Sequence, residues 1–105
     1  MSLNRYAKRR DENEPDIIAR IRSHGVSVYL LDKPCDVLCG FNGLDRIAEI
    51  KMPRNKRGDP SKLTPAQVKF KAVWKGSYTV ISNDDEADAF ALKLQADSRL
   101  VARAV

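Results

Sequence analysis

Apolar and polar residues along this chain recur with periods that predict a small α/β domain. A first helix is expected over about residues 11–24, and Gly25 directly after it is a favourable helix stop. The apolar face of this helix carries three isoleucines at helical spacing, Ile17, Ile18 and Ile21. A β-branched, apolar stretch at residues 26–31 then predicts the first strand.

The next two strands, at residues 36–41 and 44–51, are predicted to form a hairpin around Asn42 and Gly43. That dipeptide is the strongest short-range signal for a two-residue turn. Such a turn pairs Phe41 with Leu44 and sets the register of every pair beyond them. Apolar residues lie on both faces of the hairpin, with Val37, Cys39 and Phe41 on one and Leu38 and Ile47 on the other. The sheet is therefore expected to be covered on both sides.

A second helix is predicted to begin after a loop at residues 52–62. Thr64 is the expected N-cap, Pro65 suits the first helical position, and Gln67 completes a capping box. Trp74 keeps the helical spacing of this segment, which favours a place in the core or in a dimer contact over a base-stacking role.

A short strand at residues 77–81 and a final helix capped by Ser82 or Asn83 complete the pattern. The final helix has one apolar face, formed by Ala87, Phe90, Ala91 and Leu94. The order α-β-β-β-α-β-α predicts an α/β fold in which helices flank a small mixed sheet. Residues 1–10 are expected to be a flexible basic arm, and residues 11–105 a single domain.

The hairpin register has a chemical consequence, because it places Asp36 directly opposite Glu49. Two like charges face to face in a ladder repel each other unless a cation lies between them, and Mg²⁺ prefers carboxylate oxygens. Lys51 is two residues beyond Glu49 and projects from the same face of the strand. Seen singly, these residues suit solvent-facing positions at strand ends. Together, two acids and a lysine around a metal point to phosphodiester hydrolysis.

Three further residues near this group carry alternatives. Glu14 shares the buried face of the first helix, either as part of a capping box with Asp11 or as a further metal or water ligand. Gln67 is explained by its cap with Thr64, and the residues alone favour that role over contact with the scissile phosphate. A main-chain carbonyl of the strand at Ile50 offers an additional metal ligand.

The charge distribution favours a polyanionic partner. The net charge is +5, and residues 51–75 contain eight basic residues but only one acid, Asp59. A solvated surface explains any single lysine here, but the clustering beside the acids favours nucleic acid. The residues expected to contact DNA phosphates are Arg9, Arg10, Arg54, Lys56, Arg57, Lys62 and Lys69.

Several classes of protein are excluded by what the sequence lacks. No apolar run approaches the length of a membrane span, and the basic start of the chain is not followed by an apolar stretch typical of a secretory signal. No phosphate-binding loop or dinucleotide-binding glycine pattern is present, so no nucleotide cofactor is expected. The two cysteines, Cys35 and Cys39, are badly spaced for a mutual disulfide, and a cytoplasmic location is expected.

The residues resemble the D…(D/E)xK signature of the PD-(D/E)XK nuclease superfamily, with Asp36 followed by Glu49, Ile50 and Lys51. The wider resemblance is to small stand-alone VRR-NUC domains, many of them encoded by phages, and it covers about residues 10–95. It is carried by residues 10–14, 36–41, 49–51, 63–67 and 74–76. The sequence differs from the family at Cys35, where a proline is frequent. Because that proline is not a metal ligand, the difference affects only where the strand is expected to start.

This resemblance implies a restriction-endonuclease-like core and a Mg²⁺- or Mn²⁺-dependent DNA nuclease. Positions matching Asp36, Glu49 and the carbonyl of Ile50 would bind the metal, Lys51 would be the catalytic lysine, and Gln67 would lie near the site. The position of Glu14 would assist the metal. Stand-alone members resemble Holliday-junction resolvases and tend to be homodimers.

The resulting hypothesis is a homodimeric, metal-dependent, structure-selective DNA endonuclease that resembles Holliday-junction resolvases. The alternatives are a nicking, flap or single-strand nuclease of the same superfamily, a DNA-binding protein without catalysis, and a nuclease directed at RNA. Cleavage of a panel of branched substrates separates these hypotheses.

Overall fold

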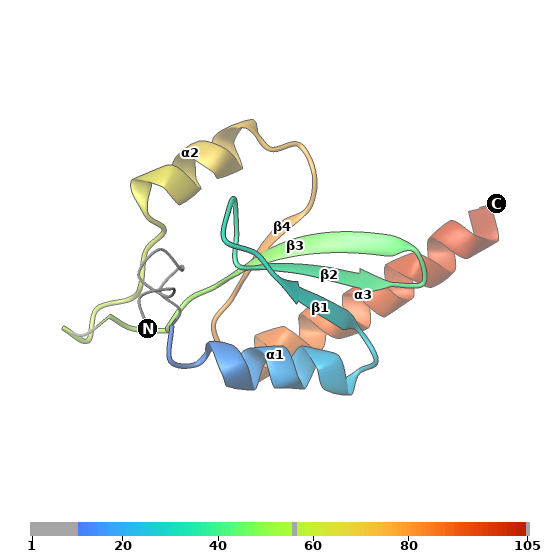
Figure 1. Ribbon diagram of the computed structural model, residues 1–105, viewed down its shortest axis with the longest axis horizontal. Helices are drawn as coiled ribbons and strands as arrows, with labels where there is room; N and C mark the ends of the chain where they lie inside the picture. Colours follow the sequence, from blue (N-terminus) through green and yellow to red (C-terminus); the bar gives the residue numbers. More distant parts are fainter. Residues whose placement is uncertain (1–10, 56, 105) are drawn as a thin grey trace, which may run out of the picture.

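The computed structural model describes residues 11–55 and 57–104, and the elements follow the predicted order α-β-β-β-α-β-α (Figure 1). They are α1 (Glu14–Ser23), β1 (Ser27–Leu30), β2 (Val37–Phe41), β3 (Leu44–Ile50), α2 (Pro65–Val73), β4 (Tyr78–Ile81) and α3 (Asp84–Ala104). The predicted α/β class with a mixed sheet is thereby confirmed. The predicted basic arm, with Arg9 and Arg10, and Lys56 of the basic loop lie outside the described residues.

The four strands form one sheet in the order β1-β2-β3-β4. Strands β1, β2 and β3 are mutually antiparallel, whereas β4 runs parallel to β3 because the connection through α2 returns the chain to the same end of the sheet (Figure 1). Helices α1 and α3 pack against each other on one face of the sheet, and α2 lies on the opposite side near β4.

The hairpin has the predicted register. Phe41 pairs with Leu44, and the ladder continues outward to the pair Val37 and Ala48. Asn42 and Gly43 have φ angles of 48° and 81°, the left-handed conformation that a two-residue hairpin turn of the favoured twist requires. The next position outward on each strand is Asp36 and Glu49, so the turn brings the two predicted metal ligands to the same level of the sheet.

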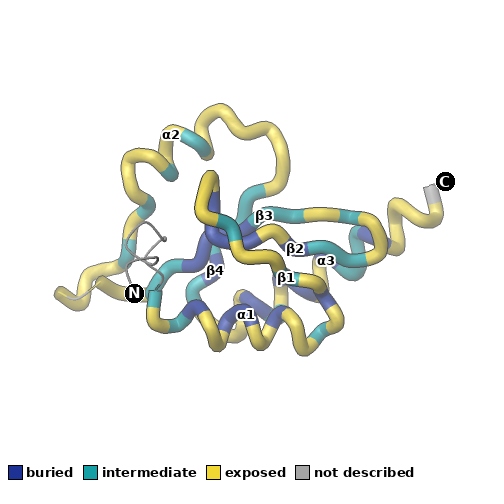
Figure 2. The backbone as a smooth tube through the Cα atoms, in the orientation of Figure 1, coloured by how far each residue is buried: buried dark blue, intermediate teal, exposed yellow. Residues whose placement is uncertain are grey.

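The hydrophobic core lies between the sheet and the pair α1 and α3 (Figure 2). The predicted apolar faces of both helices are confirmed, since all of their apolar members are buried. They pack against alternate residues of the strands, which point to one side of the sheet. The core residues of the strands are Val37, Cys39, Ala48, Ile50 and Ile81.

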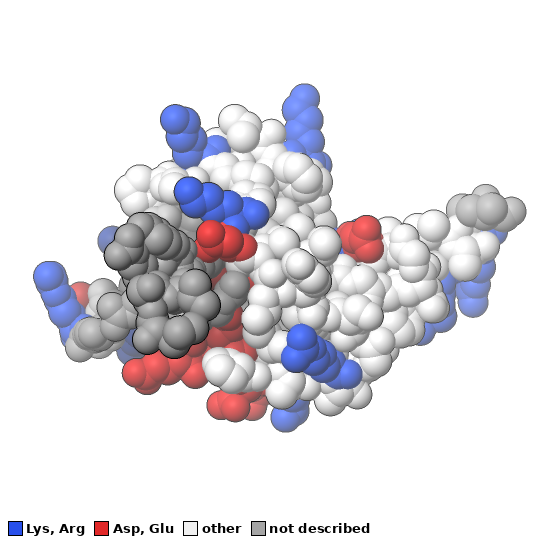
Figure 3. Space-filling model, in the orientation of Figure 1, with Lys and Arg blue, Asp and Glu red and all other residues white. Residues whose placement is uncertain are grey.

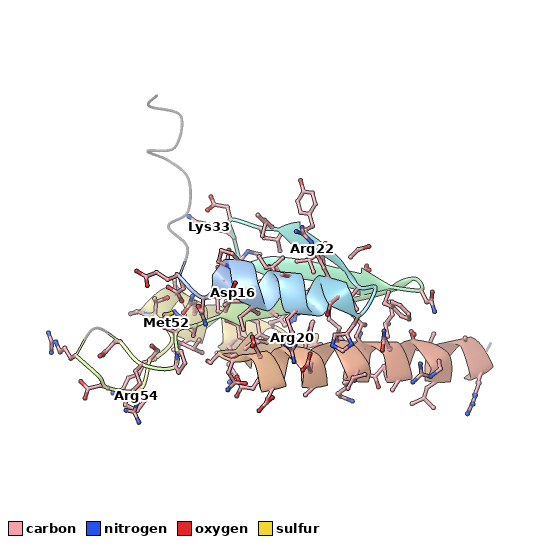
Figure 4. All side chains as sticks on the ribbon, turned by 90° about the horizontal axis from the view of Figure 1, so that it is seen from below. Asp16, Arg20, Arg22, Lys33, Met52 and Arg54 are labelled. Carbon is pink, nitrogen blue, oxygen red and sulfur yellow. The ribbon has the colours of Figure 1, made fainter. Side chains whose placement is uncertain are left out.

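Helices α1 and α3 are also joined at their surface. Arg20 lies on the side of α1 that faces α3 (Figure 4), and it donates two hydrogen bonds of 2.9 Å to the two carboxylate oxygens of Asp88. His24 lies 2.8 Å from the same carboxylate. The guanidinium of Arg20, and then His24, hold the pKa of Asp88 well below its usual range. This polar clamp ties the helix that begins near the candidate site to the longest helix of the fold.

The expectation that the sheet is covered on both sides is wrong for its β1–β2 half. Tyr29 and Leu38 are register partners on the face opposite α1 and α3, and they are 70% and 37% exposed. Helix α2 has only nine residues and none of them is buried. It reaches the β4 end of that face through Phe70, whose ring lies 5.5 Å from that of Tyr78. A helix this short leaves the far strands open.

The start of α1 also differs from the prediction. Asn13, not Asp11, is the N-cap, and its side chain makes no capping hydrogen bond. Instead, the Asp11 carboxylate accepts a hydrogen bond of 3.2 Å from the backbone N–H of Met52. The Asn13 amide donates to the carbonyls of Lys51 at 3.1 Å and Ser82 at 3.2 Å. Both side chains bond to main-chain groups where β3 and β4 end, and Asp11 therefore does not form the predicted capping box with Glu14.

The caps of the other two helices follow the sequence. Thr64 and Gln67 form a reciprocal capping box, as predicted. Of the two predicted caps of α3, Asn83 takes the role, because its side chain accepts a hydrogen bond of 2.8 Å from Glu86 N–H. Trp74 follows α2 and is 45% exposed, so it does not lie in the core, and the alternative of a dimer contact stays a prediction. Across residues 11–55 and 57–104, no helix combines the length and apolar content that crossing a membrane requires.

Candidate functional site

Three carboxylates are buried in α1 and in the hairpin that β2 and β3 form. Glu14 in the first turn of α1, Asp36 just before β2 and Glu49 in β3 are exposed by only 2%, 4% and 1%. Burying a carboxylate costs free energy unless hydrogen-bond donors or a cation offset the lost hydration. The burial of Asp36 and Glu49 is therefore compatible with the predicted metal site, where a cation would offset their charge.

Asp36 is held by the main chain of β3. The backbone N–H of Ile50 donates a hydrogen bond of 2.7 Å to Oδ2 of the Asp36 carboxylate. In an antiparallel ladder, the N–H and C=O of one residue point to the same neighbouring strand. The carbonyl of Ile50 therefore lies on the same side of β3 as Asp36, and two members of the predicted ligand set come together.

Glu49 is held by a residue of β4. The phenolic O–H of Tyr78 donates a hydrogen bond of 3.2 Å to Oε1 of Glu49. Burial, and then the adjacent Glu49 carboxylate, raise the pKa of the Tyr78 phenol, so the hydroxyl keeps its proton at neutral pH. We did not predict a role for Tyr78 from the sequence. The parallel pairing of β4 with β3 reveals it, and no local sequence signal encodes that pairing.

Lys51 directly follows β3, and its backbone is anchored on both sides. Its N–H donates a hydrogen bond of 3.0 Å to the carbonyl of Ile81, and its own carbonyl accepts the bond from Asn13. The side chain is half-buried. These two hydrogen bonds fix the position of the Lys51 main chain, two residues beyond Glu49, and so fix the point from which its side chain projects. The role of Asn13 was also missed from the sequence, because its partners are distant in the chain.

A hollow of about 1060 Å³ opens beside Lys51, between the start of α1 and the loop that follows β3. Its basic lining residues are Lys51, Arg54, Arg57 and Lys62. Its acidic lining residues are Asp11, Glu12 and Asp59. In Figure 3, basic side chains project from α2 and from the loop at the left, with acidic side chains near the start of α1. The predicted catalytic lysine thus shares one concavity with three of the predicted phosphate contacts.

The loop that lines this hollow is internally bonded. The side-chain oxygen of Asn55 accepts hydrogen bonds from the N–H groups of Arg57 at 2.9 Å and Asp59 at 3.0 Å. The guanidinium of Arg54 donates a bond of 2.7 Å to the carbonyl of Gly58. Met52 and Arg54 lie along this loop, at the end away from α3 (Figure 4). Arg57 and Lys62 remain exposed.

Gln67 and Lys69 lie on α2. The Oε1 atom of Gln67 accepts a hydrogen bond of 2.8 Å from Thr64 N–H, so the structure places this side chain in the cap. Its contact with a phosphate remains a prediction. Lys69 is exposed on the same helix, as a phosphate contact requires.

The donor set fits a magnesium-type ion with few protein ligands. Mg²⁺ is commonly bound by one or two carboxylates and keeps several waters. Asp36, Glu49 and the carbonyl of Ile50 provide that number of hard oxygen ligands around one strand end. In the described part of the chain, no three His, Cys, Asp or Glu side chains form a metal cluster. Direct ligation by Glu14 in addition to the other two acids therefore remains a prediction.

The two cysteines do not belong to this chemistry. Cys35 and Cys39 are buried and form no disulfide. Burial raises the pKa of the Cys39 thiol to about 12, with a further contribution from Cys35. A protonated, inaccessible thiol is neither a nucleophile nor a metal ligand at neutral pH.

Comparison of the chain with family models, curated proteins and solved structures finds no match.

Proposed function

We propose that this protein is a Mg²⁺- or Mn²⁺-dependent deoxyribonuclease of the VRR-NUC type that cleaves branched DNA. The observation that carries the proposal is the Asp36 carboxylate, which the Ile50 amide holds at 2.7 Å at the level of the buried Glu49. Lys51 directly follows the same strand and lines a hollow that also contains Arg54, Arg57 and Lys62. Two buried acids on the hairpin, followed by a lysine that lines a hollow with three further basic residues, suit hydrolysis of a polyanion.

The fold supports this proposal at the level of element order. An antiparallel hairpin followed by a helix and a strand parallel to β3 is compatible with the expected restriction-endonuclease-like core. The catalytic residues would then lie on the rigid hairpin. Placement on paired strands keeps catalytic groups within the narrow tolerances that positioning demands.

Each residue has a defined role in the proposed reaction. Asp36, Glu49 and the Ile50 carbonyl would hold the metal ion, which when bound polarises the phosphoryl group and lowers the pKa of a water. Lys51 would donate hydrogen bonds from its ammonium group to that water and to the negative charge that develops on phosphorus oxygens. Arg57 and Lys62 would bind phosphates on either side of the scissile bond.

The direct test compares cleavage of four-way junctions, flaps, single strands and linear duplexes with Mg²⁺ or Mn²⁺. Asp36→Asn and Lys51→Ala are each expected to lower the cleavage rate by roughly 10²-fold or more. Asp45→Asn, an exposed acid of the same hairpin, and Lys93→Ala, an exposed lysine of α3, are the matched controls and retain the rate. Cleavage by Asp36→Asn at the wild-type rate would overturn the proposal.

A DNA-binding protein without catalysis is the second candidate, because binding of phosphates by the four basic residues of the hollow requires no metal. It predicts salt-sensitive binding and no cleavage with any divalent ion. Fluorescence anisotropy at several salt concentrations measures the first property. Arg57→Ala should reduce the slope of log K against log salt by about one unit, equally for all DNA sequences.

The open half of the sheet supports the proposed homodimer. Tyr29 and Leu38 form a neighbouring pair of exposed apolar residues on this open face of the sheet. Exposed apolar patches on soluble domains commonly mark contact sites. Light scattering after size exclusion should give twice the chain mass, and Leu38→Asp should halve it.

A further inference from the structure

Tyr78 lies between α2 and the buried acids. Its hydroxyl is 3.2 Å from Oε1 of Glu49, and its ring is 5.5 Å from the ring of Phe70 at an interplanar angle of 56°. In the parallel ladder, Tyr78 pairs with Ile47 and Val80 pairs with Glu49. All four side chains therefore project from one face of the sheet, and the phenol reaches one step along that face to the carboxylate.

An aromatic cluster at the end of α2 holds this ring. Phe70 stacks on Trp74 with 5.4 Å between ring centroids, and the indole N–H of Trp74 donates a bond of 3.0 Å to the carbonyl of Ser77. A Cβ at Gly76 would come within 2.7 Å of the indole, so only glycine fits beneath it. Because Ser77 directly precedes Tyr78, these contacts position the backbone from which the phenol projects.

We infer that Tyr78 is a positioning residue, which orients the Glu49 carboxylate for the metal through its hydroxyl. The inference rests on the proposed function, which assigns Glu49 to the metal. A glutamate carboxylate rotates in a broad torsional well, so a hydrogen bond to one oxygen selects one orientation of both. Hydrogen bonds of this kind to metal ligands typically contribute 10–100-fold to metal affinity or activity.

The geometry also connects α2 to the site. Helix α2 has no buried residues. Among the described residues, it makes an aromatic contact with the sheet through the ring of Phe70, which packs against the ring of Tyr78. Displacement of α2 would release the Tyr78 ring and with it the Glu49 carboxylate. The aromatic residues after the capping box therefore serve the metal site and not only the helix.

The test is Tyr78→Phe, which keeps the ring contact with Phe70 and removes only the hydroxyl. Thr79→Val is the matched control, since it removes the hydroxyl of the next residue in β4, whose side chain projects from the opposite face of the sheet. Mn²⁺ affinity of the DNA-free protein is measured by isothermal titration calorimetry, with kcat and KM for cleavage measured separately. We expect Tyr78→Phe to bind Mn²⁺ roughly 10–100-fold more weakly, with the KM for DNA unchanged.

A double-mutant cycle separates positioning from a structural role. In a Glu49→Gln background, Tyr78→Phe should have little further effect on Mn²⁺ affinity, because the group it orients is gone. Unchanged Mn²⁺ affinity in Tyr78→Phe, while the wild type binds and cleaves, overturns this inference and leaves the proposed function intact. If Tyr78→Phe lowers the free energy of unfolding in EDTA by as much as it lowers the free energy of Mn²⁺ binding, the hydroxyl has a structural role, and this result also overturns the inference. Failure of the wild type to bind Mn²⁺ and to cleave overturns both.

Discussion

The side chain of Asn13 joins the start of α1 to the ends of two strands, and its removal should have a measurable cost. Its amide nitrogen donates hydrogen bonds to the carbonyls of Lys51 and Ser82, which are 38 and 69 residues away in the chain. Asn13 makes no side-chain capping bond in α1, so Asn13→Ala removes these long-range bonds without also removing a cap. The substitution therefore isolates one tertiary connection.

The expected magnitude follows from the two lost bonds. A typical intramolecular hydrogen bond contributes roughly 0.5–1.5 kcal/mol, and a carbonyl left without a partner adds to the loss. Both bonds are partly buried, which gives water some access to the freed carbonyls. We expect Asn13→Ala to lower the free energy of unfolding by about 2 kcal/mol. In a domain of this size that corresponds to a fall in Tm of roughly 10 °C.

Urea denaturation followed by circular dichroism measures this change, with the m-value expected to stay constant. Asn13→Asp is the informative companion, because a carboxylate donates no hydrogen bond and would face two carbonyl oxygens. It should therefore be less stable than Asn13→Ala. If both variants unfold within about 0.5 kcal/mol of the wild type, the range of ordinary surface substitutions, the described role of Asn13 is refuted.

Three further predictions concern the core, the thiols and the hairpin turn. Ile21→Ala should cost about 2–5 kcal/mol in chemical denaturation because Ile21 is fully buried, whereas Leu92→Ala, at a 54% exposed position, should cost far less. The Cys39 thiol, with its pKa raised from 9.0 to about 12, should resist alkylation at pH 8 in the native state. Its contribution to stability should be present below pH 9 and be lost as the pH rises toward 12, in denaturation series at increasing pH. Gly43→Ala should cost roughly 1 kcal/mol through its φ of 81° alone, because a Cβ there meets no atom within 4 Å, and an unchanged urea midpoint would contradict this.

Local sequence signals were sufficient for much of the scaffold. Asn42 and Gly43 predicted the turn, and the turn predicted the pairing that brings Asp36 level with Glu49. Thr64 and Gln67 predicted the start of α2. These signals succeed because a tight turn or a helix cap depends on a few residues that are adjacent in the chain, whose preferred conformations are nearly independent of the rest of the molecule.

The contacts that complete the candidate site arise only in the folded chain. The polar residues before α1 had the pattern of a capping box, yet Asp11 and Asn13 bond to the ends of β3 and β4. Tyr78 reaches Glu49 only because β4 pairs parallel to β3 through a long connection. The open half of the sheet likewise reflects the placement of one short helix.

The sequence by itself determined the order of the elements, the hairpin register and the face from which the acids and Lys51 project. The tertiary structure alone decided which polar groups hold those side chains and which half of the sheet stays open. The physical reason is range: periodicity and caps act over a single turn or strand pair, whereas hydrogen bonds between distant segments depend on how the helices and strands finally pack.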